Sequence, residues 1–432
     1  MIIVRDRVLA AMLVTAVFAA ASTSAAQPPP SAGLDALLVS ARDALNSGRL
    51  DQAEANLNRA LVIAPDNPEA QLELGLVYLF TDRVAMARSQ FAQVADARSG
   101  DVQVMRLIGA GFVRTAHLAD AEPYLARALR SAPDDTEVNL LLGQVYSGTG
   151  RQAQAIERFL NVARIDPGLP HAHYFLGIAY TLSGQRAEGI AELERAVALA
   201  PAQTGFRFYL GVAYIEARRD ADAATELERV VALAPDDVEA RVNLAWAQIN
   251  AGRSGDAAAS AADVVKRQPK HAVGWFLLGE ATRRQGDNDA SIPDYERAVA
   301  IDPAMVDALF ALGTVYYWRN DFDKSTDWFG RLLAVDSRHV GAHYQMGKIS
   351  LQLGRVDDAI GHLEVCARLA PANKGAHYQL SRAYRMRHED EKADQELALF
   401  RALGPESGDD HDLGDQRLEQ IVTRPVRPLP QH

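Results

Sequence analysis

The sequence has little of what an enzyme or a cofactor site would require. It holds one cysteine, Cys366, among 432 residues, which excludes an internal disulfide framework and any metal site built from several cysteines. It also lacks a glycine-rich phosphate loop, an HExxH helix and a GxSxG nucleophile turn. We therefore expect no enzyme and no cofactor, and we expect Cys366 to be a small buried residue.

Positive charge and long apolar runs are also scarce. The chain has 45 Lys and Arg against 56 Asp and Glu, a formal net charge of -11. Such a balance disfavours nonspecific binding to nucleic acid or to anionic lipid, so we expect no nucleic-acid partner. The apolar run from Val8 to Ala21 covers 14 residues, which is short for a membrane span.

Residues 1–26 have the layout of a secretory signal peptide. Arg5 and Arg7 precede the apolar run, small residues from Ser22 to Ala26 follow it, and three prolines come after Gln27. This layout predicts cleavage near Ala26, a linker over residues 27–33, and a periplasmic or secreted protein. The alternatives are an uncleaved N-terminal anchor, which would tie the chain to a membrane, and an intracellular chain with an incidental apolar start.

What the chain has in abundance is a repeat of 34 residues, which recurs eleven times in one phase over residues 34–407. It is clearest at residues 170–203, PHAHYFLGIAYTLSGQRAEGIAELERAVALAPAQ. Position 8 is Gly in most repeats, position 20 is always small, and position 32 is Pro in nine. The repeats start at Leu34, Pro68, Val102, Thr136, Pro170, Thr204, Val238, Ala272, Val306, Val340 and Lys374.

Each of these preferences has a physical reason. Apolar residues at positions 7 and 11, and then at 20, 24 and 27, have the spacing of two amphipathic helices. Glycine at position 15, as in Gly150 and Gly184, ends the first helix in a left-handed conformation, and proline at position 32 ends the second. Small residues at positions 8 and 20 let the two helices approach closely.

This period and these residue types resemble the tetratricopeptide repeat family, over about 374 of the 432 residues. The resemblance implies an all-α fold, a right-handed α-solenoid superhelix of about eleven helix–turn–helix repeats. The chain departs from the family at position 4, where the family favours Trp and only Trp275 complies. Residues 408–432 are polar and proline-rich and are predicted to be a disordered tail, in which Leu413 to Val422 is a candidate capping helix.

In that family, positions 2, 5, 9 and 12 of the first helix line a concave groove. Position 5 is aromatic in six of the last seven repeats, and Trp246 lies one turn further along in the exception. The predicted groove aromatics are Tyr174, Phe208, Trp246, Phe276, Phe310, Tyr344 and Tyr378. Such a ladder can bind extended peptides, helices or sugar rings by stacking, and the alternative is that these rings pack neighbouring helices together.

Charge along the predicted groove changes from acidic in the early repeats to basic in the late ones. The late cations are Arg283, Lys348 and Arg382, and they are candidates for holding an acidic peptide segment or a C-terminal carboxylate. The alternative is a set of solvated surface charges. The histidines at position 4 belong to different repeats, too far apart to share a metal ion, so no metal site is expected.

These observations predict a non-enzymatic protein–protein interaction scaffold of the cell envelope that binds a protein or peptide partner in its groove. The alternative is a carbohydrate-binding accessory protein of envelope polysaccharide assembly or export. The residues indicate no particular oligomeric state.

Overall fold

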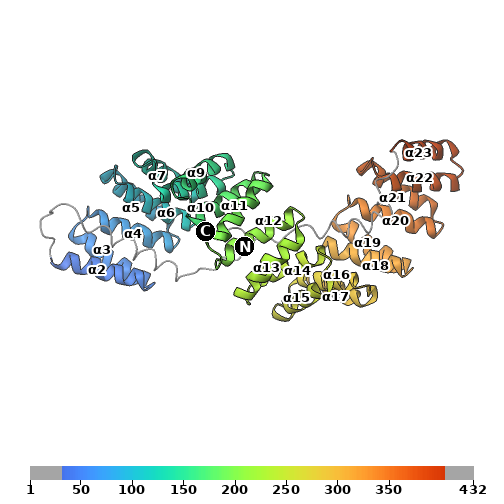
Figure 1. Cartoon of the computed structure of the whole chain (residues 1–432), viewed down its shortest axis with the longest axis horizontal. Coiled ribbons are helices and arrows are strands. Elements are labelled where there is room, and N and C mark those ends of the chain that lie inside the picture. Colours follow the sequence, from blue (N-terminus) through green and yellow to red (C-terminus); the bar gives the residue numbers. More distant parts are fainter. Residues whose placement is uncertain (1–31, 404–432) are drawn as a thin grey trace. The chain divides into compact units, whose positions relative to one another are not determined.

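A computed structural model describes residues 32–403, which form 22 helices and no strand (Figure 1). These residues divide by their contacts into a first part, up to Leu199, and a second part, from Ala200 onward. The predicted signal peptide, most of the predicted linker and the predicted tail lie outside the described residues. Within residues 32–403, no helix combines the length and the hydropathy needed to cross a lipid bilayer.

The first part consists of five consecutive helical pairs. Their bounds are α2 (Ala32–Asn46), α3 (Leu50–Ile63), α4 (Pro68–Phe80), α5 (Val84–Ala97), α6 (Val102–Arg114), α7 (Leu118–Ser131), α8 (Thr136–Gly148), α9 (Gln152–Ile165), α10 (Pro170–Leu182) and α11 (Arg186–Leu199). Each second helix packs against its own partner, and α3, α5, α7 and α9 also pack against the first helix of the next pair.

The second part continues with six pairs built in the same way. Their bounds are α12 (Thr204–Glu216), α13 (Asp220–Leu233), α14 (Val238–Asn250), α15 (Ser254–Arg267), α16 (Ala272–Arg284), α17 (Asn288–Ile301), α18 (Val306–Trp318), α19 (Phe322–Val335), α20 (Val340–Gln352), α21 (Val356–Leu369), α22 (Lys374–Met386) and α23 (Asp390–Ala402).

The predicted phase of the repeat matches these bounds. From the second repeat on, the first helix, called helix A below, begins at position 1 and ends at position 13, and the second, helix B, begins at position 17. The fold prediction is therefore confirmed: each part is an all-α solenoid of helix–turn–helix repeats. Cys366 is fully buried, also as predicted.

Helices A and B of one repeat meet where position 8 faces position 24. A Cβ atom placed on Gly313 would lie 2.6 Å from the ring of Phe329, and one on Gly177 would lie 2.7 Å from Leu193. Phe329 and Leu193 are both buried. Glycine at position 8 is thus required because the side chain at position 24 already fills the space that a Cβ would take.

The turn between helices A and B is left-handed at position 15 in every repeat. Six repeats have glycine there, among them Gly150 and Gly184, with φ of 80° and 85°. The other five have Asp82, Ala116, Arg218, Asn320 and His388, with φ between 58° and 63°. The conformation was predicted from the glycines, but the repeats without glycine adopt it too, although it costs an L-residue roughly 1–2 kcal/mol.

Two Gly→Ala substitutions in one repeat are expected to have opposite effects on stability. Gly313→Ala should lower the free energy of unfolding by about 1–3 kcal/mol, because its methyl group overlaps the ring of Phe329. Gly330→Ala, on the exposed side of α19 with no atom within 4 Å of the new Cβ, should raise it by about 0.5–1 kcal/mol. Urea unfolding followed by circular dichroism measures both, and equal effects of the two substitutions would contradict the packing argument.

Candidate functional site: the helix A face

The structure places all the predicted groove residues on helices A. We define the helix A face as the residues at positions 2, 5, 9 and 12 of these helices. Tyr174 lies on α10 of the first part and is partly exposed. In the second part the predicted residues are Phe208 on α12, Trp246 on α14, Phe276 and Arg283 on α16, Phe310 on α18, Tyr344 and Lys348 on α20, and Tyr378 and Arg382 on α22.

Two of the predicted aromatic contacts are core residues. Phe276 and Phe310 expose none of their surface. The ring centroid of Phe276 lies 5.9 Å from that of Tyr295, and the centroid of Phe310 lies 5.5 Å from that of Phe329, both on helices B. These two rings pack the helical pair together and cannot touch a ligand, so for them the packing alternative is correct.

Residues at position 5 also bridge one repeat to the next. A Cβ on Gly375, at position 2 of α22, would lie 2.7 Å from the hydroxyl oxygen of Tyr344 on α20. A Cβ on Gly341 would lie 3.1 Å from the ring of Phe310. Glycine at position 2 makes room for the ring of the preceding repeat, and Tyr344 keeps only 7% of its surface exposed.

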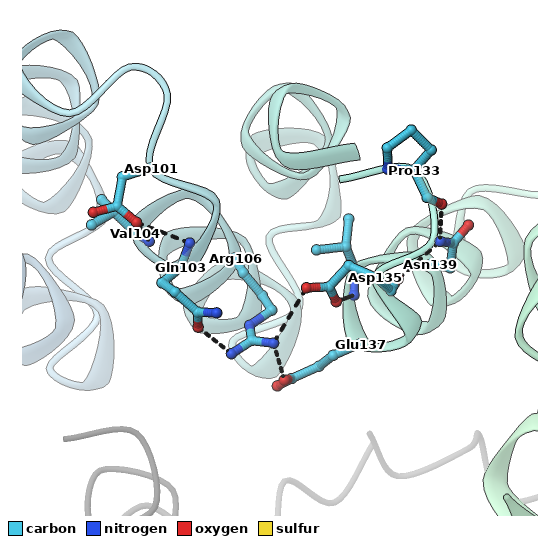
Figure 2. Close-up of polar contacts among 9 residues, drawn as sticks. Asp101, Gln103, Val104, Arg106, Pro133, Asp135, Glu137 and Asn139 are labelled. Atoms are coloured by element: carbon cyan, nitrogen blue, oxygen red, sulfur yellow. Dashed lines mark hydrogen bonds and ion pairs between the residues drawn. The ribbon is translucent and has the colours of Figure 1, made fainter. Parts of the chain in front are cut away.

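The first part uses an ion pair at the same place. Figure 2 shows Arg106, at position 5 of α6, reaching the start of α8, where it lies 2.7 Å from Glu137 and 3.6 Å from Asp135. Arg106 also donates a hydrogen bond to Gln103 on its own helix. Asp135 in turn caps α8 by accepting a 2.9 Å hydrogen bond from the backbone N–H of Val138. Charges on this stretch of the face therefore neutralise one another.

Arg283 is likewise held by a neighbouring acid. Its Nε donates a 2.9 Å hydrogen bond to Glu280, which is fully buried and also accepts a 2.5 Å hydrogen bond from the hydroxyl of Tyr295. Burial opposes the charge of Glu280, but Arg283 beside it holds the pKa of this carboxyl below its usual value. Arg283 is thus one half of a buried ion pair, which sequence reasoning missed because Glu280 looks like a surface residue.

Two of the predicted cations lie on the helix A face near the end of the second part. Lys348 lies with its Nζ 4.9 Å from the ring of Tyr317 and 5.5 Å from that of Tyr344. Arg382 is exposed, and its one hydrogen bond within the described chain goes to Gln379 on the same helix, at 3.0 Å. Tyr378, one turn before Arg382, is 43% exposed.

Behind the face, position 4 connects eight of the eleven helices A to the turn before them. In these repeats the side chain at position 4 donates a hydrogen bond of 2.8–3.1 Å to the backbone carbonyl at position 32 of the preceding repeat. The donors are Gln71, Asn139, His173, Arg207, Arg241, Trp275, His343 and His377. Residue types other than Trp at position 4 thus make the same hydrogen bond as Trp275, each with its own N–H donor.

Position 4 also meets position 23 of its own helix B. Nδ1 of His173 lies 2.6 Å from the carboxylate of Glu192, and Nδ1 of His377 lies 2.6 Å from that of Glu396. In the tenth repeat, position 23 is His362, and its Nδ1 lies 3.1 Å from Nδ1 of His343. Within residues 32–403, no group of three or more His, Cys, Asp or Glu side chains is placed to hold a metal ion.

Comparison with protein families agrees with this architecture. A tetratricopeptide repeat model matches residues 38–102, 171–238 and 242–306, and a second model of that name matches residues 116–178. A third model, for anaphase-promoting complex, cyclosome, subunit 3, matches residues 284–366. The chain belongs to the tetratricopeptide repeat family. Members of this family are protein–protein interaction scaffolds, and this tetratricopeptide repeat protein has the fold of one.

Solved tetratricopeptide repeat structures are similar in fold but distant in sequence. YrrB, described as a TPR protein with an unusual peptide-binding site, is 20% identical, covering 43% of this chain and 96% of YrrB, with a TM-score of 0.41. Yeast Tom70 is 11% identical over 90% of this chain and 94% of its own, with a TM-score of 0.43. PilF of Pseudomonas aeruginosa is 19% identical over 48% and 93%, with a TM-score of 0.40. A search of curated proteins found no match. At these TM-scores the likenesses carry no argument about what this chain binds.

One half-buried acid leads to a prediction about pH. Asp294 occupies position 23 of the eighth repeat, and no side chain of the described residues donates a hydrogen bond or an ion pair to it. Burial raises its pKa to about 6, against an ordinary value near 3.8. Because the folded state holds this proton more tightly than the unfolded state does, stability from this group is present at low pH and is lost as the pH rises through 6.

We expect Asp294→Asn to stabilise this tetratricopeptide repeat protein at pH 7.5 by about 1 kcal/mol, since Asp294 is half-exposed and solvent screens part of the effect. The gain should shrink as the pH falls and approach zero near pH 3, where the carboxyl is largely protonated in both states. Urea midpoints at the two pH values measure this difference. A gain that does not change with pH would show that the carboxyl does not titrate as the structure indicates.

Proposed function

We propose that the chain binds an acidic, extended segment of a protein partner on the helix A face of α18, α20 and α22. The observation that carries the proposal is the charge of the last two helices A: α20 and α22 contain no Asp or Glu, and they present Lys348 and Arg382 on this face. Glutamate or aspartate side chains of a partner would supply the acids that these helices lack.

The geometry around Lys348 supports an organised contact. Its Nζ stands against the rings of Tyr317 and Tyr344, and Gln352 donates a 3.4 Å hydrogen bond to the hydroxyl of Tyr317. A cation fixed between two rings loses little conformational freedom when a carboxylate binds. Tyr378 and Arg382 on the next helix A would extend the same contact along the partner.

The ion pair of Arg106 supports placing the partner on these late helices A and not on α6 and α8. Arg106 is already neutralised by Asp135 and Glu137 (Figure 2), so an incoming acid would have to displace them. Arg283 is committed to the buried Glu280 in the same way. Arg382, in contrast, is exposed, and its hydrogen bond goes to the uncharged side chain of Gln379.

The direct test is binding of a fluorescent peptide of about ten residues, rich in Asp and Glu, measured by anisotropy at pH 7.5. The double variant Lys348→Ala, Arg382→Ala should bind roughly tenfold more weakly than the wild-type protein, because two charge-assisted contacts are lost. Affinity should also fall with added salt. The peptide in which Asn and Gln replace the acids should bind poorly.

A matched control is available on helix B of the ninth repeat. Lys324 and Arg331 are exposed on α19 and stand over the rings of Tyr316 and Trp328. The double variant Lys324→Ala, Arg331→Ala removes the same net charge away from the helix A face and should keep the affinity. Equal losses in both double variants, or equal binding of the neutral peptide, would refute the proposed site.

Sugar stacking, the alternative function, has weaker support. A carbohydrate platform needs several exposed rings along the face. Tyr378 is 43% exposed, but Phe208, Trp246 and Tyr344 keep between 5% and 7% of their surface, and two further rings keep none. Binding of an envelope polysaccharide can be measured with the same two double variants. Polysaccharide binding without peptide binding would favour this alternative.

We further propose that the protein acts in the cell envelope. The proposal rests on the sequence of residues 1–26 alone. Expression of the full chain in a bacterial host, followed by fractionation and N-terminal sequencing, should yield a periplasmic or secreted species beginning near Gln27. Recovery with Met1 in the membrane fraction would instead favour the uncleaved anchor, and recovery in the cytoplasm would overturn the envelope role.

A further inference from the structure

The first and last repeats of the described array each lack one side of a contact that interior repeats make. At an interior joint, a Cβ on Gly274, at position 3 of its helix A, would lie 3.4 Å from the Cβ of Val264, at position 27 of the preceding helix B. Position 27 is buried in the first ten repeats, but Phe400 in the eleventh is only partly buried. At the other end, Ala36 at position 3 of α2 is exposed.

The contact between neighbouring helices A is likewise incomplete at the last repeat. The ring of Tyr344, at position 5 of α20, lies against position 2 of the next helix A, which is Gly375. Tyr378, at position 5 of α22, is 43% exposed, whereas Tyr344 is 7% exposed. The ring centroids of Tyr378 and Phe400 lie 5.3 Å apart. The last repeat therefore presents two packed rings that no further repeat of the described chain covers.

The corresponding surface of the first repeat is acidic. On α2, Asp35, Ala36, Val39 and Asp43 lie at positions 2, 3, 6 and 10, and all four are exposed. Position 10 is buried and uncharged in every later repeat. Within residues 32–403, neither the Asp35 nor the Asp43 carboxylate takes part in an ion pair or a side-chain hydrogen bond. These acids lie on the side of α2 that, in any later helix A, would face the preceding repeat.

Interior joints show which positions meet when one repeat stacks on another. Arg42, at position 9 of α2, pairs with Glu69 at position 2 of α4 and lies 2.7 Å from Glu73 at position 6. A Cβ on Gly111, at position 10 of α6, would lie 2.9 Å from Leu76 at position 9 of α4. Position 9 of one repeat thus meets positions 2, 6 and 10 of the next repeat.

We propose that copies of this chain associate head to tail, with α2 of one copy stacked on α22 and α23 of another in the register of an interior joint. In that register Arg382, at position 9 of α22, meets Asp35 and Asp43 of the other copy. The small Ala36 of the other copy packs on the ring of Phe400. The two ends are thus complementary in charge and in register, which favours a second copy as the occupant.

The charges of α22 make Arg382 the main electrostatic contact of this joint. Arg382 is exposed, and its hydrogen bond goes to the uncharged Gln379. Arg385, at position 12, already lies 2.8 Å from Asp394 of α23. Because two different surfaces meet, the contact is heterologous, and it leaves each copy with one free end until the assembly closes.

Sedimentation equilibrium at pH 7.5 without peptide tests the association. The weight-average mass of the wild-type protein should rise with concentration. Arg382→Glu, and separately the double variant Asp35→Lys, Asp43→Lys, should weaken self-association on the order of tenfold or more, because like charges then meet. The matched control Arg331→Glu, on the exposed side of α19, should not weaken it. A monomeric wild type, or an equal effect of Arg331→Glu, would overturn the proposal.

Mixing the two variants separates a specific contact from a damaged fold. Alone, the Arg382→Glu protein presents glutamate to its own acidic α2, and the Asp35→Lys, Asp43→Lys protein presents lysine to its own Arg382. In an equal mixture each altered end meets the opposite charge on the other variant, so association should return toward the wild-type level. Variants with wild-type helicity that stay monomeric when mixed would refute the proposed register.

A disulfide between copies tests the register directly. The variants Ala36→Cys and Phe400→Cys place thiols at positions 3 and 27, whose Cβ atoms at the interior joint are close enough for a disulfide. Oxidation of the mixture should give a dimer that joins one variant to the other, which neither variant alone should give. Absence of this dimer would count against the joint. So would a photocrosslinker in place of Phe400 that reacts with residues 404–432 of its own chain instead of α2.

The inference does not depend on the proposed peptide contact, although both use Tyr378 and Arg382. The Asp35→Lys, Asp43→Lys protein keeps both residues, so it should bind the acidic peptide as the wild type does while losing self-association. A wild type that binds the peptide but stays monomeric would refute this inference alone. Self-association without peptide binding would refute the proposed function alone.

Discussion

The close approach of helices A and B at positions 8 and 24 is the contact on which the rest of the structure depends. Where position 8 is glycine, position 24 is large: Leu227 fills the space over Gly211, and Tyr295 fills the space over Gly279. The seventh repeat keeps the approach by the opposite choice, with Ala245 and Ala261 both small and both buried. In each case at least one of the two facing residues is small, which lets helices A and B of the pair approach closely.

Charge is distributed along the helix A face according to how each repeat meets the next. In the first part, Arg42 pairs with Glu69 and Glu73 of the following helix A, and Arg106 pairs with Glu137. These pairs stabilise the stack and leave little charge for a partner. In the last repeats of the second part, glycine at position 2 receives a ring, and Lys348 lies against two rings. Stacking and the proposed recognition therefore involve the same few positions.

The period, the helix bounds and the left-handed turns could be predicted from the sequence because each depends on residues within one repeat. Burial on the helix A face could not, because it depends on the next repeat. Phe310 is buried with Gly341 as its neighbour, which is a signal that the sequence does contain at position 2. The burial of Glu280 has a similar signal in Tyr295, whose hydroxyl at position 24 needs an acceptor. The acceptor of the position 4 side chains is a backbone carbonyl, which no residue type reveals.

The hydrogen bonds from position 4 also define where one module of this protein ends and another begins. His173 reaches back six residues to the Pro167 carbonyl, which the repeat as written assigns to the preceding module. A fragment cut at Pro170 would therefore leave a buried imidazole without its acceptor, whereas one cut before Pro167 would carry the whole contact with it. The folding module is thus offset from the sequence repeat, and shuffled or shortened arrays of this chain are best joined between the end of helix B and the proline at position 32.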